Sequence, residues 1–228
     1  MICMSTKYEV HILKTVAFMF ANYSYIVVDT ATKAALVVDP AWEIDKITKK
    51  LYELDAHLEA ILLTHSHHDH VNLVNPLVKR FSPRVYMSKT EIDYYGFRCN
   101  NLYALNDMDE INVGETRVSC LHTPGHTAGG MCYLLEDSIF TGDTIFTEGC
   151  GICNTDGGSA EQMFESIQRV KSIVTPDFLV YPGHSYGKAP GKTIDYLMEW
   201  NIYFQFETIE YFVDFRMRKN QKGLFRFK

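Results

Sequence analysis

The hydrophobic pattern of the chain changes several times between the two-residue spacing of strands and the wider spacing of helices. Within residues 18–38, the β-rich runs YSYIVVD and AALVVDP are separated by TATK at hairpin distance, which predicts an antiparallel meander. From Glu43 onward the apolar residues recur at steps of three and four, which predicts an amphipathic surface helix. Its apolar stripe consists of Ile44, Ile47, Leu51, Leu54 and Leu58.

Further along the chain, short apolar runs alternate with helical patterns. Strands are predicted at 60–63, 84–87, 116–121, 132–135 and 178–181. One helix is predicted at 73–81, and another begins at Ser159, where Gln162 three residues later completes a capping box. Its inner stripe consists of Met163, Ile167, Val170 and Val174. The alternation predicts an α/β (α+β) fold in which helices cover sheets and functional sites lie in loops at strand ends.

The 228 residues suit a single domain, because no repeat, low-complexity segment or Gly/Ser linker divides them. Residues 193–218 are helical in pattern and rich in aromatic residues, and a basic tail follows. We therefore expect one domain over 1–228, with a helical and basic extension from about residue 193. The exposed-looking aromatic residues of this extension suit a homodimer as well as a core, so the sequence leaves the oligomeric state open.

Charge and cysteine content narrow the class of protein. A formal net charge of -6 argues against general nucleic-acid binding, which depends on a basic surface. No stretch approaches the ~18 apolar residues of a membrane span, and the first ten residues contain no signal-peptide pattern. The six cysteines are scattered, so we expect reduced thiols in a cytoplasmic protein without a membrane partner.

The strongest chemical signal is the run HSHHDH at 65–70. In an extended or turning loop His65 and His67 can face one metal ion, while Asp69 and His70 can face a second. Imidazole and carboxylate are the ligands expected for zinc, and iron and manganese accept the same groups. Three later segments, TPGHT, TGDT and YPGHS, each place a glycine directly before a residue that can bind metal. These three residues are His126, Asp143 and His184.

An ordinary structural role is the better interpretation of the remaining histidines, since a lone histidine is more often hydrogen-bonded than metal-bound. These residues are His11, His57, His68 and His122, of which His68 is the one that could line the site. Cys150-x-x-Cys153 is a weak redox or metal signal without a second pair, and we interpret both residues as small loop cysteines.

The motif HxHxDH, followed in order by His, Asp and His, resembles that of the metallo-β-lactamase superfamily over nearly the whole chain. The resemblance implies an αββα sandwich of two mixed sheets flanked by helices, with two metal ions at one edge. It also implies a ligand set for each ion. His65, His67 and His126 would bind the first ion, Asp69, His70 and His184 the second, and Asp143 would bridge them. Asp69 would in addition act in catalysis.

Within that superfamily, the stretches GDTIFTEGCG and VYPGHSYG resemble the glyoxalase II-like branch. MSKTEIDYYGFRC, LHTPGHTAGGMCYLL, FTEGCGIC and YPGHSYGKAPGKT look more similar still to zinc-dependent hydrolases of bacterial polyketide-synthase clusters. Such proteins are thought to remove acyl groups from carrier-protein thioesters. Glyoxalase II-like enzymes commonly have an arginine after the Cys-Gly of this loop, where this chain has Ile152. That departure, with the short C-terminal region, argues against glutathione thioesters.

The resemblance therefore predicts a hydrolase with two zinc ions that cleaves acyl thioesters, with acyl carrier protein as the partner. Lys188 and Lys192, just after the last ligand, are candidates for contacting an acidic carrier or its phosphopantetheine phosphate. The later basic residues suit a solvated tail without a role. The aromatic residues at 200–206 suit core packing, and an apolar acyl pocket is the alternative.

Four other functions stay open at this point. A glyoxalase II-type hydroxyacylglutathione hydrolase shares the whole motif, and a persulfide dioxygenase shares it but uses one iron and oxygen. A secreted β-lactamase is disfavoured because many of those enzymes have a cysteine where this chain has Asp143. A scaffold without catalytic activity is disfavoured because none of the seven ligand positions has been lost.

Overall fold

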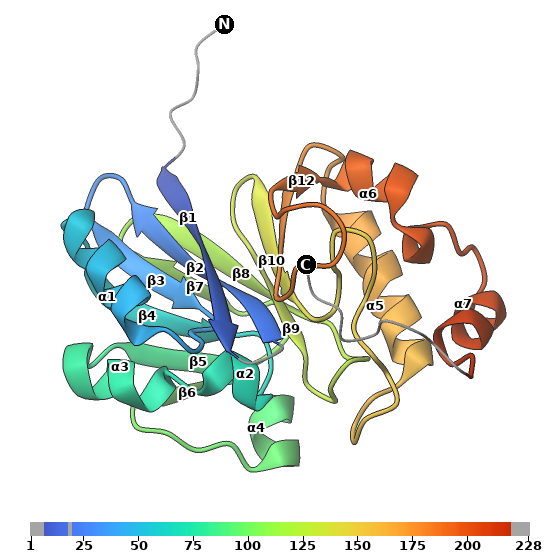
Figure 1. Ribbon diagram of the computed structural model, residues 1–228, viewed down its shortest axis with the longest axis horizontal. Helices are drawn as coiled ribbons and strands as arrows, with labels where there is room; N and C mark the ends of the chain where they lie inside the picture. The colour runs from blue at the N-terminus through green and yellow to red at the C-terminus, as the bar shows by residue number, and fades with distance from the viewer. Residues whose placement is uncertain (1–6, 18–19, 220–228) are drawn as a thin grey trace, which may run out of the picture.

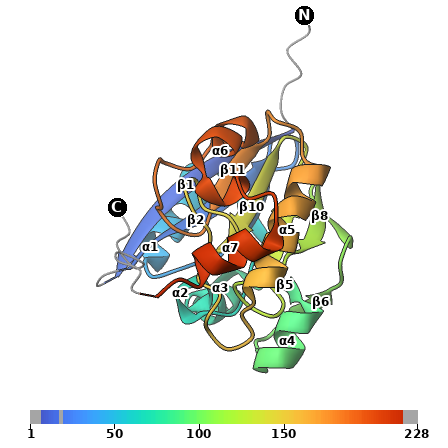
Figure 2. The ribbon, with the colours of Figure 1, turned by 90° about the vertical axis from the view of Figure 1, so that its right-hand side faces the viewer.

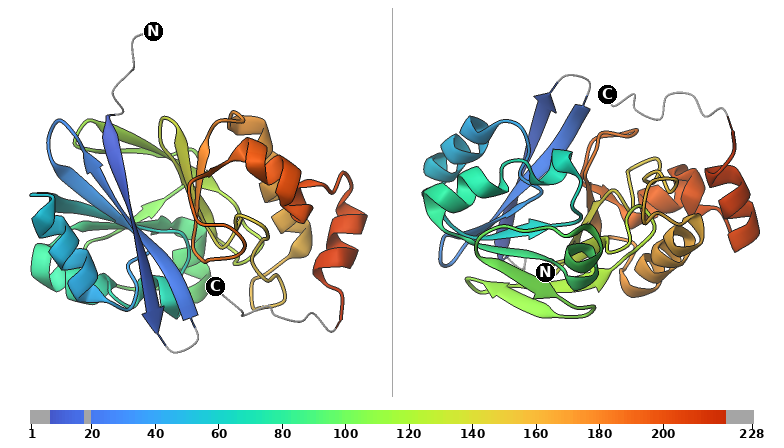
Figure 3. Two further views of the ribbon diagram at one scale, coloured as in Figure 1. Left: turned by 45° about the horizontal axis from the view of Figure 1, so that its top comes forward. Right: turned by 90° about the horizontal axis from the view of Figure 1, so that it is seen from below.

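Two six-stranded sheets lie face to face, with helices on the outer face of each, in the computed structural model, which describes residues 7–17 and 20–219 (Figures 1 and 3). The first sheet has the order β1-β2-β3-β4-β5-β6. Its strands are β1 (Tyr8–Ala17), β2 (Phe20–Asp29), β3 (Ala34–Val38), β4 (His57–Leu63), β5 (Arg84–Ser88) and β6 (Leu102–Leu105). The β1–β2–β3 meander is antiparallel, and β3 to β6 run parallel.

The second sheet has the order β12-β11-β10-β9-β8-β7 and is also mixed. Its strands are β7 (Glu110–Val113), β8 (Thr116–His122), β9 (Met131–Leu134), β10 (Ser138–Gly142), β11 (Leu179–Pro182) and β12 (Lys192–Thr193). Only β10 and β11 pair in parallel. The expected αββα sandwich of two mixed sheets is confirmed.

Alternation along the strands separates three hydrophobic cores. In β2, Tyr25 and Val27 point into the core between the sheets, while Ile26 and Val28 point to the outer face. Because both faces are covered, β3 is apolar and buried along its whole length. The outer cores lie under α1 and α3 on one side and under α5 on the other.

The helices of the first sheet are α1 (Ile44–Glu53), α2 (His68–Val71), α3 (Val74–Phe81) and α4 (Lys89–Tyr95). Helix α1 is shorter than its apolar stripe predicted. Asp55 has a left-handed backbone (φ 50°), and the amide of Ala56 donates to the carbonyl of Leu51, which closes the helix. Leu58 therefore belongs to β4, and its place in the helical stripe is wrong.

The helices of the second sheet are α5 (Ala160–Ile173), α6 (Ile194–Trp200) and α7 (Ile209–Arg216), with a 3-10 turn at Ile202–Phe204. The predicted N-terminus of α5 is confirmed, since the side chain of Ser159 accepts a hydrogen bond from the amide of Gln162. The predicted helical segment 193–218 is three short pieces, which pack with α5 on the second sheet (Figure 2). Assignment of the whole chain to one domain stays a prediction.

Several elements have no counterpart in the sequence prediction. These are β1, β6, β7, β12, α2 and α4, and β10 was given no predicted bounds. Strands β1 and β6 form the two edges of the first sheet, and β7 and β12 form those of the second, so their residues are partly exposed and the apolar signal is weak. No helix among the described residues is long and apolar enough to cross a bilayer.

Candidate metal centre

Seven side chains that lie far apart in the sequence meet at one edge of the sandwich, near α2 in Figure 1. His65 and His67 follow β4, and Asp69 and His70 lie on the single turn of α2. The other three, His126, Asp143 and His184, follow β8, β10 and β11. The sandwich brings these strand ends together, so the structure gathers all seven residues that the sequence pointed to.

The first group consists of three imidazoles. His65, His67 and His126 each offer one ring nitrogen, and these three atoms lie within 4.8 Å of one another. His67 Nδ1 is 3.0 Å from His126 Nε2, a hydrogen-bond distance at which one nitrogen must carry a proton and the other must accept it. Nitrogen atoms converging at this distance are the arrangement that a metal ion requires.

The second group contains a carboxylate and two imidazoles. Ligand atoms of Asp69, His70 and His184 again lie within 4.8 Å of one another. His184 Nε2 is 3.3 Å from His70 Nε2 and 3.3 Å from Asp69 Oδ2. A hydrogen bond between Asn22 Nδ2 and Asp69 Oδ2 (3.2 Å) orients this carboxylate, and Trp42 Nε1 in turn donates to Asn22 Oδ1 (2.8 Å).

Asp143 lies between the two groups. Its Oδ2 is 3.6 Å from His126 Nε2 in the first group and 3.4 Å from His184 Nε2 in the second. Its Oδ1 is 3.5 Å from His70 Nε2. The carboxylate can therefore face an ion in each group at the same time.

Hydrogen bonds to the far ring nitrogens fix the orientation of the ligands. His70 Nδ1 lies 2.9 Å from Asp39 Oδ2, His126 Nδ1 lies 2.7 Å from the carbonyl of Ile152, and His184 Nδ1 lies 2.9 Å from that of Ala21. Such partners set the tautomer that turns the other nitrogen toward a metal.

Asp39 was not predicted from the sequence. Its carboxylate accepts from the amide and hydroxyl of Thr64 (2.8 and 2.6 Å) as well as meeting His70, so it supports the site from behind. Its ligand atom also lies within 4.8 Å of His65 and His70, but these hydrogen bonds already occupy it. The available signal was its position at the end of a buried strand, one strand over from the HSHHDH run.

Glycines permit the crowding at this edge, as predicted. Gly142, directly before Asp143, has φ of +49°, and a Cβ there would lie 2.3 Å from Thr64 Oγ1. A Cβ on Gly183, directly before His184, would lie 2.5 Å from Asp143 Oδ1 and 2.7 Å from His70 Cε1. A larger residue at Gly183 would displace a ligand, and one at Gly142 would displace Thr64, the residue directly before His65.

The donor set fits a metal ion. His65 Nε2 and Asp143 Oδ1 are buried in the cluster without a hydrogen-bond partner among the described residues. A buried polar atom without a partner destabilises the folded protein, and a bound metal ion would provide the missing partner. Burial lowers the pKa of His126 to about 4 and also lowers that of His65 well below its usual range, so both favour the neutral form that binds metal. Burial opposes protonation of His70, but Asp69 and Asp143 outweigh it and raise its pKa to about 10.

The other histidines and the cysteine pair stay outside the cluster. His68 is exposed and packs edge-on against Trp42, with ring centroids 5.8 Å apart. Cys150 and Cys153 are buried with the apolar residues under α5, and burial raises the pKa of Cys153 to about 11. None of the candidate metal groups found among residues 7–17 and 20–219 contains a cysteine, which supports the structural interpretation of the pair.

The basic residues of the C-terminal region do not all belong to the solvated tail that the sequence had suggested. Arg216 does not belong to a solvated tail, because it is buried and donates to Tyr203 Oη (3.1 Å). Lys222, Arg226 and Lys228 lie outside the described residues. Lys188 is exposed on the loop after His184, and Lys192 Nζ lies 5.3 Å from the centre of the Tyr196 ring.

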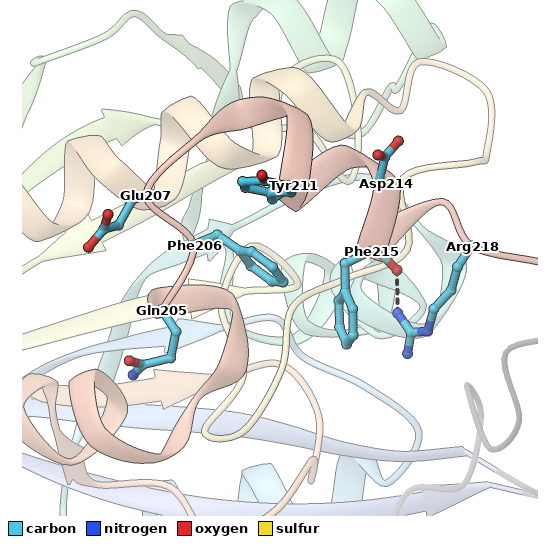
Figure 4. Close-up of a pocket in the computed structure, with 7 residues that line it drawn as sticks. All are labelled: Gln205, Phe206, Glu207, Tyr211, Asp214, Phe215 and Arg218. Carbon is cyan, nitrogen blue, oxygen red and sulfur yellow. Dashed lines mark hydrogen bonds between the residues drawn. The ribbon is translucent and has the colours of Figure 1, made fainter.

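The aromatic residues of this region divide between core and surface. Tyr203 and Phe204 are buried, whereas Trp200 is 59% exposed. Phe206 and Phe215 line a pocket on the helical face, together with polar side chains (Figure 4). Its complete lining is Gln205, Phe206, Glu207, Tyr211, Asp214, Phe215 and Arg218. No metal-centre residue lines this pocket, so it is separate from the site.

Comparison with known proteins agrees with this geometry. The family described as "Metallo-beta-lactamase superfamily" matches residues 18–184. The chain is 62% identical over 225 residues to the probable polyketide biosynthesis zinc-dependent hydrolase PksB of Bacillus subtilis (strain 168), covering 99% of this chain and 100% of that protein. It is 35% identical to the probable hydroxyacylglutathione hydrolase glo2 of Schizosaccharomyces pombe (strain 972), covering 75% of this chain and 66% of that protein. The crystal structure of ETHE1 from Myxococcus xanthus superimposes with a TM-score of 0.83 at 30% identity, covering 92% of each chain.

Proposed function

The chain belongs to the metallo-beta-lactamase superfamily, and on that premise we propose that it is a zinc-dependent hydrolase of acyl thioesters. Its substrates would be acyl groups carried by acyl carrier proteins in polyketide biosynthesis. One observation carries the proposal. All seven metal-capable residues meet in one cluster, in a chain that matches the whole length of a relative named a probable polyketide biosynthesis zinc-dependent hydrolase.

Each residue of the cluster has a place in this proposal. His65, His67 and His126 would hold one zinc ion, Asp69, His70 and His184 would hold the other, and Asp143 would face both. Bound zinc supplies a water of lowered pKa and polarises a carbonyl group, which are the two requirements for hydrolysing a thioester at neutral pH.

Asp69 is the residue of the cluster best placed to accept a proton from a water molecule and to release it again. Its side chain is 20% exposed, whereas that of His70 is 1% exposed and that of Asp143 is 9% exposed. Asn22 Nδ2 donates to Asp69 Oδ2 and to its backbone carbonyl (3.2 and 2.8 Å), which holds the carboxylate in one orientation. The carboxylate can accept a hydrogen bond from a water molecule and orient it toward the acyl carbon.

The chemistry of the leaving group favours a thioester over an amide. A thiol has a pKa of ~8.5, so a thiolate departs with little help from a general acid, whereas an amine leaving group must be protonated. Asp69 is the only partly exposed carboxylate among the seven residues. The site is therefore better equipped for the easier leaving group.

One observation and one hypothesis favour a carrier protein over glutathione as the thiol. The loop after Cys150-Gly151 has Ile152 rather than the arginine common in glyoxalase II-like enzymes, and the carbonyl of Ile152 instead orients His126. Lys188 and Lys192 would lie at the carrier-binding side, where their charge would attract an acidic protein or a phosphopantetheine phosphate.

The test compares an acyl-phosphopantetheinyl carrier protein with S-lactoylglutathione, with metal content measured on the same sample. We expect turnover of the carrier thioester and about two zinc ions per chain. Preference for S-lactoylglutathione would contradict the carrier assignment. One iron per chain with oxygen uptake on glutathione persulfide would replace hydrolysis with the dioxygenase reaction.

Reversing the charge of the two lysines tests the carrier contact separately. Lys188→Glu/Lys192→Glu should lower kcat/KM for the carrier thioester roughly fivefold to thirtyfold, since an exposed ion pair is worth up to ~1 kcal/mol. It should leave hydrolysis of a small acyl thioester unchanged. Lys79→Glu, on the exposed face of α3, is the matched control. An equal loss on both substrates would contradict a role in carrier binding.

A further inference from the structure

Helix α4 places a fully buried carboxylate behind the metal centre. The side chain of Glu91 is 0% exposed and accepts three hydrogen bonds. Its Oε1 accepts from the amide and the hydroxyl of Ser66 (2.8 and 2.7 Å), and its Oε2 accepts from the amide of Gly129 (3.0 Å). Because both oxygens accept and neither donates, the pattern is that of an ionised carboxylate.

The two partners of Glu91 belong to the two loops that carry the first ligand group. Ser66 lies between His65 and His67, and Gly129 lies three residues after His126. Glu91 therefore connects the loop of two ligands to the loop of the third. Its hydrogen bonds go to Ser66 and Gly129 and to no side chain of the second group, so the support that we consider concerns the first group.

Close packing makes this connection specific. A Cβ on Gly129 would lie 2.1 Å from the Glu91 amide nitrogen, so the loop after His126 rests directly on the backbone of α4. Tyr95, one turn further along α4, accepts from the amide of Ala128 (3.2 Å) and donates to the carbonyl of Asp156 (2.7 Å). Helix α4 thus braces the loop at two neighbouring residues.

No lysine or arginine among residues 7–17 and 20–219 pairs with the charge of Glu91. Its hydrogen-bond donors are two backbone amides and a hydroxyl, and it forms no ion pair with a lysine or arginine of the described part of the chain. A buried charge without an opposite charge is destabilising. The imidazoles of the first group carry no negative charge of their own, so a cation held by their two loops would be favoured by the buried carboxylate that hydrogen-bonds to both loops.

We infer that Glu91 is a positioning residue for the first metal site: it sets the spacing of His65 and His67 relative to His126, and its buried charge favours a cation between them. The inference rests on the zinc site of the proposed function and is independent of the substrate. Support from outside the ligand set is worth about 10- to 100-fold in metal affinity.

The test is zinc affinity measured by competition with a chelator, without any substrate. Glu91→Gln keeps the size of the side chain, but its NH2 group must face either the Ser66 donors or the Gly129 amide, and the charge is lost. To separate the two sites, the change is made in a His184→Ala background, which keeps the first group, and in a His67→Ala background, which keeps the second. Tyr95→Phe is the matched control, because it removes the other α4 contact and leaves the charge in place.

We expect Glu91→Gln to weaken zinc binding by about 10- to 100-fold in the His184→Ala background and to leave it unchanged in the His67→Ala background. Glu91→Asp, which keeps the charge, should recover part of the affinity. Equal weakening in both backgrounds would show a general structural role and overturn the inference, as would unchanged affinity in both. A failed carrier assay would leave these affinities untouched, so the two proposals fail separately.

Discussion

The two halves of the metal centre contain the same number of ligands but carry their charge differently. In the half formed by His65, His67 and His126 all ligands are imidazoles, and the far nitrogen of His126 faces a neutral carbonyl. In the half formed by Asp69, His70 and His184 one ligand is a carboxylate, and a second carboxylate, Asp39, contacts His70 directly. The second half therefore holds its negative charge in and next to its ligands.

The pKa shifts follow this division. Burial lowers the pKa values of His65 and His126; Asp143 opposes this shift at His126 without reversing it, and neighbouring imidazoles lower both pKa values further. In the second half burial acts in the same direction, but nearby carboxylates raise the pKa values of His70 and His184. Asp143 supplies negative charge to both halves, and on our inference the first half obtains further negative charge from Glu91, which lies behind its ligands. The difference shows that two sites with matching ligand counts need different support from the surrounding fold.

Removing zinc from both halves should have the largest effect. Zinc at about 100 times its Kd stabilises a folded protein by ~2.7 kcal/mol per site, so two sites contribute roughly 5 kcal/mol. For a chain of this size, chelation should lower Tm by about 10–20 °C and abolish turnover. Differential scanning calorimetry with and without chelator measures the shift. A zinc-independent Tm would contradict the two-site account, and His67→Ala should retain about half of the shift.

The second-largest effect is expected from replacing Asp143, the residue that both halves share. Asp143→Ala removes the carboxylate that faces both groups, and the loss of turnover should exceed the about 100-fold that outer contacts supply. Zinc content by mass spectrometry should fall toward one ion per chain. Asp177→Ala, an exposed carboxylate in another loop, serves as the control. Full activity with two zinc ions would show that Asp143 does not bridge.

Asp39→Asn should affect the second half more than the first, because Asp39 contacts the ligand His70 directly and reaches His65 only through Thr64. The amide keeps the size of the side chain but weakens the contacts to His70 and Thr64. Zinc affinity in the His67→Ala background should fall by about 10- to 100-fold, while the His184→Ala background should lose less. If both backgrounds lost affinity equally, the two halves would not be supported separately.

The smallest effect is expected from the cysteine pair. Cys150→Ala/Cys153→Ala removes two buried thiols and should destabilise the protein by about 1–3 kcal/mol in urea unfolding. Zinc stoichiometry and kcat should stay unchanged, because neither cysteine belongs to a candidate metal group. Loss of one zinc ion on this change would assign the pair a role that the structure does not support.

The ligand residues could be predicted from the sequence because each directly follows a strand-like run or lies in one short motif. Asp39, Glu91 and Asn22 could not, because their roles depend on which elements become neighbours. Asp39 meets His70 because β3 lies parallel to β4, with Val38 opposite Leu62. Glu91 lies on a seven-residue helix without a recognisable pattern, and its partners are 25 and 38 residues away.

Strands β3 and β4, which are buried on both faces, were predicted, whereas the edge strands of the two sheets were not. The apolar runs of β3 and β4 indicated strands directly, whereas β1 alternates between buried and exposed residues at a sheet edge. The overlong stripe of α1 arose because Leu58 continues the helical spacing by coincidence. The left-handed turn at Asp55 ends the helix before that residue, and spacing alone does not reveal such a turn.

The central claim is that one centre holds two zinc ions with Asp143 between them. Anomalous X-ray diffraction at the zinc edge, on crystals of zinc-loaded protein, tests it most directly. The account predicts two peaks, one among His65, His67 and His126 and the other among Asp69, His70 and His184, both in contact with Asp143. A single peak, or a peak away from Asp143, would contradict it.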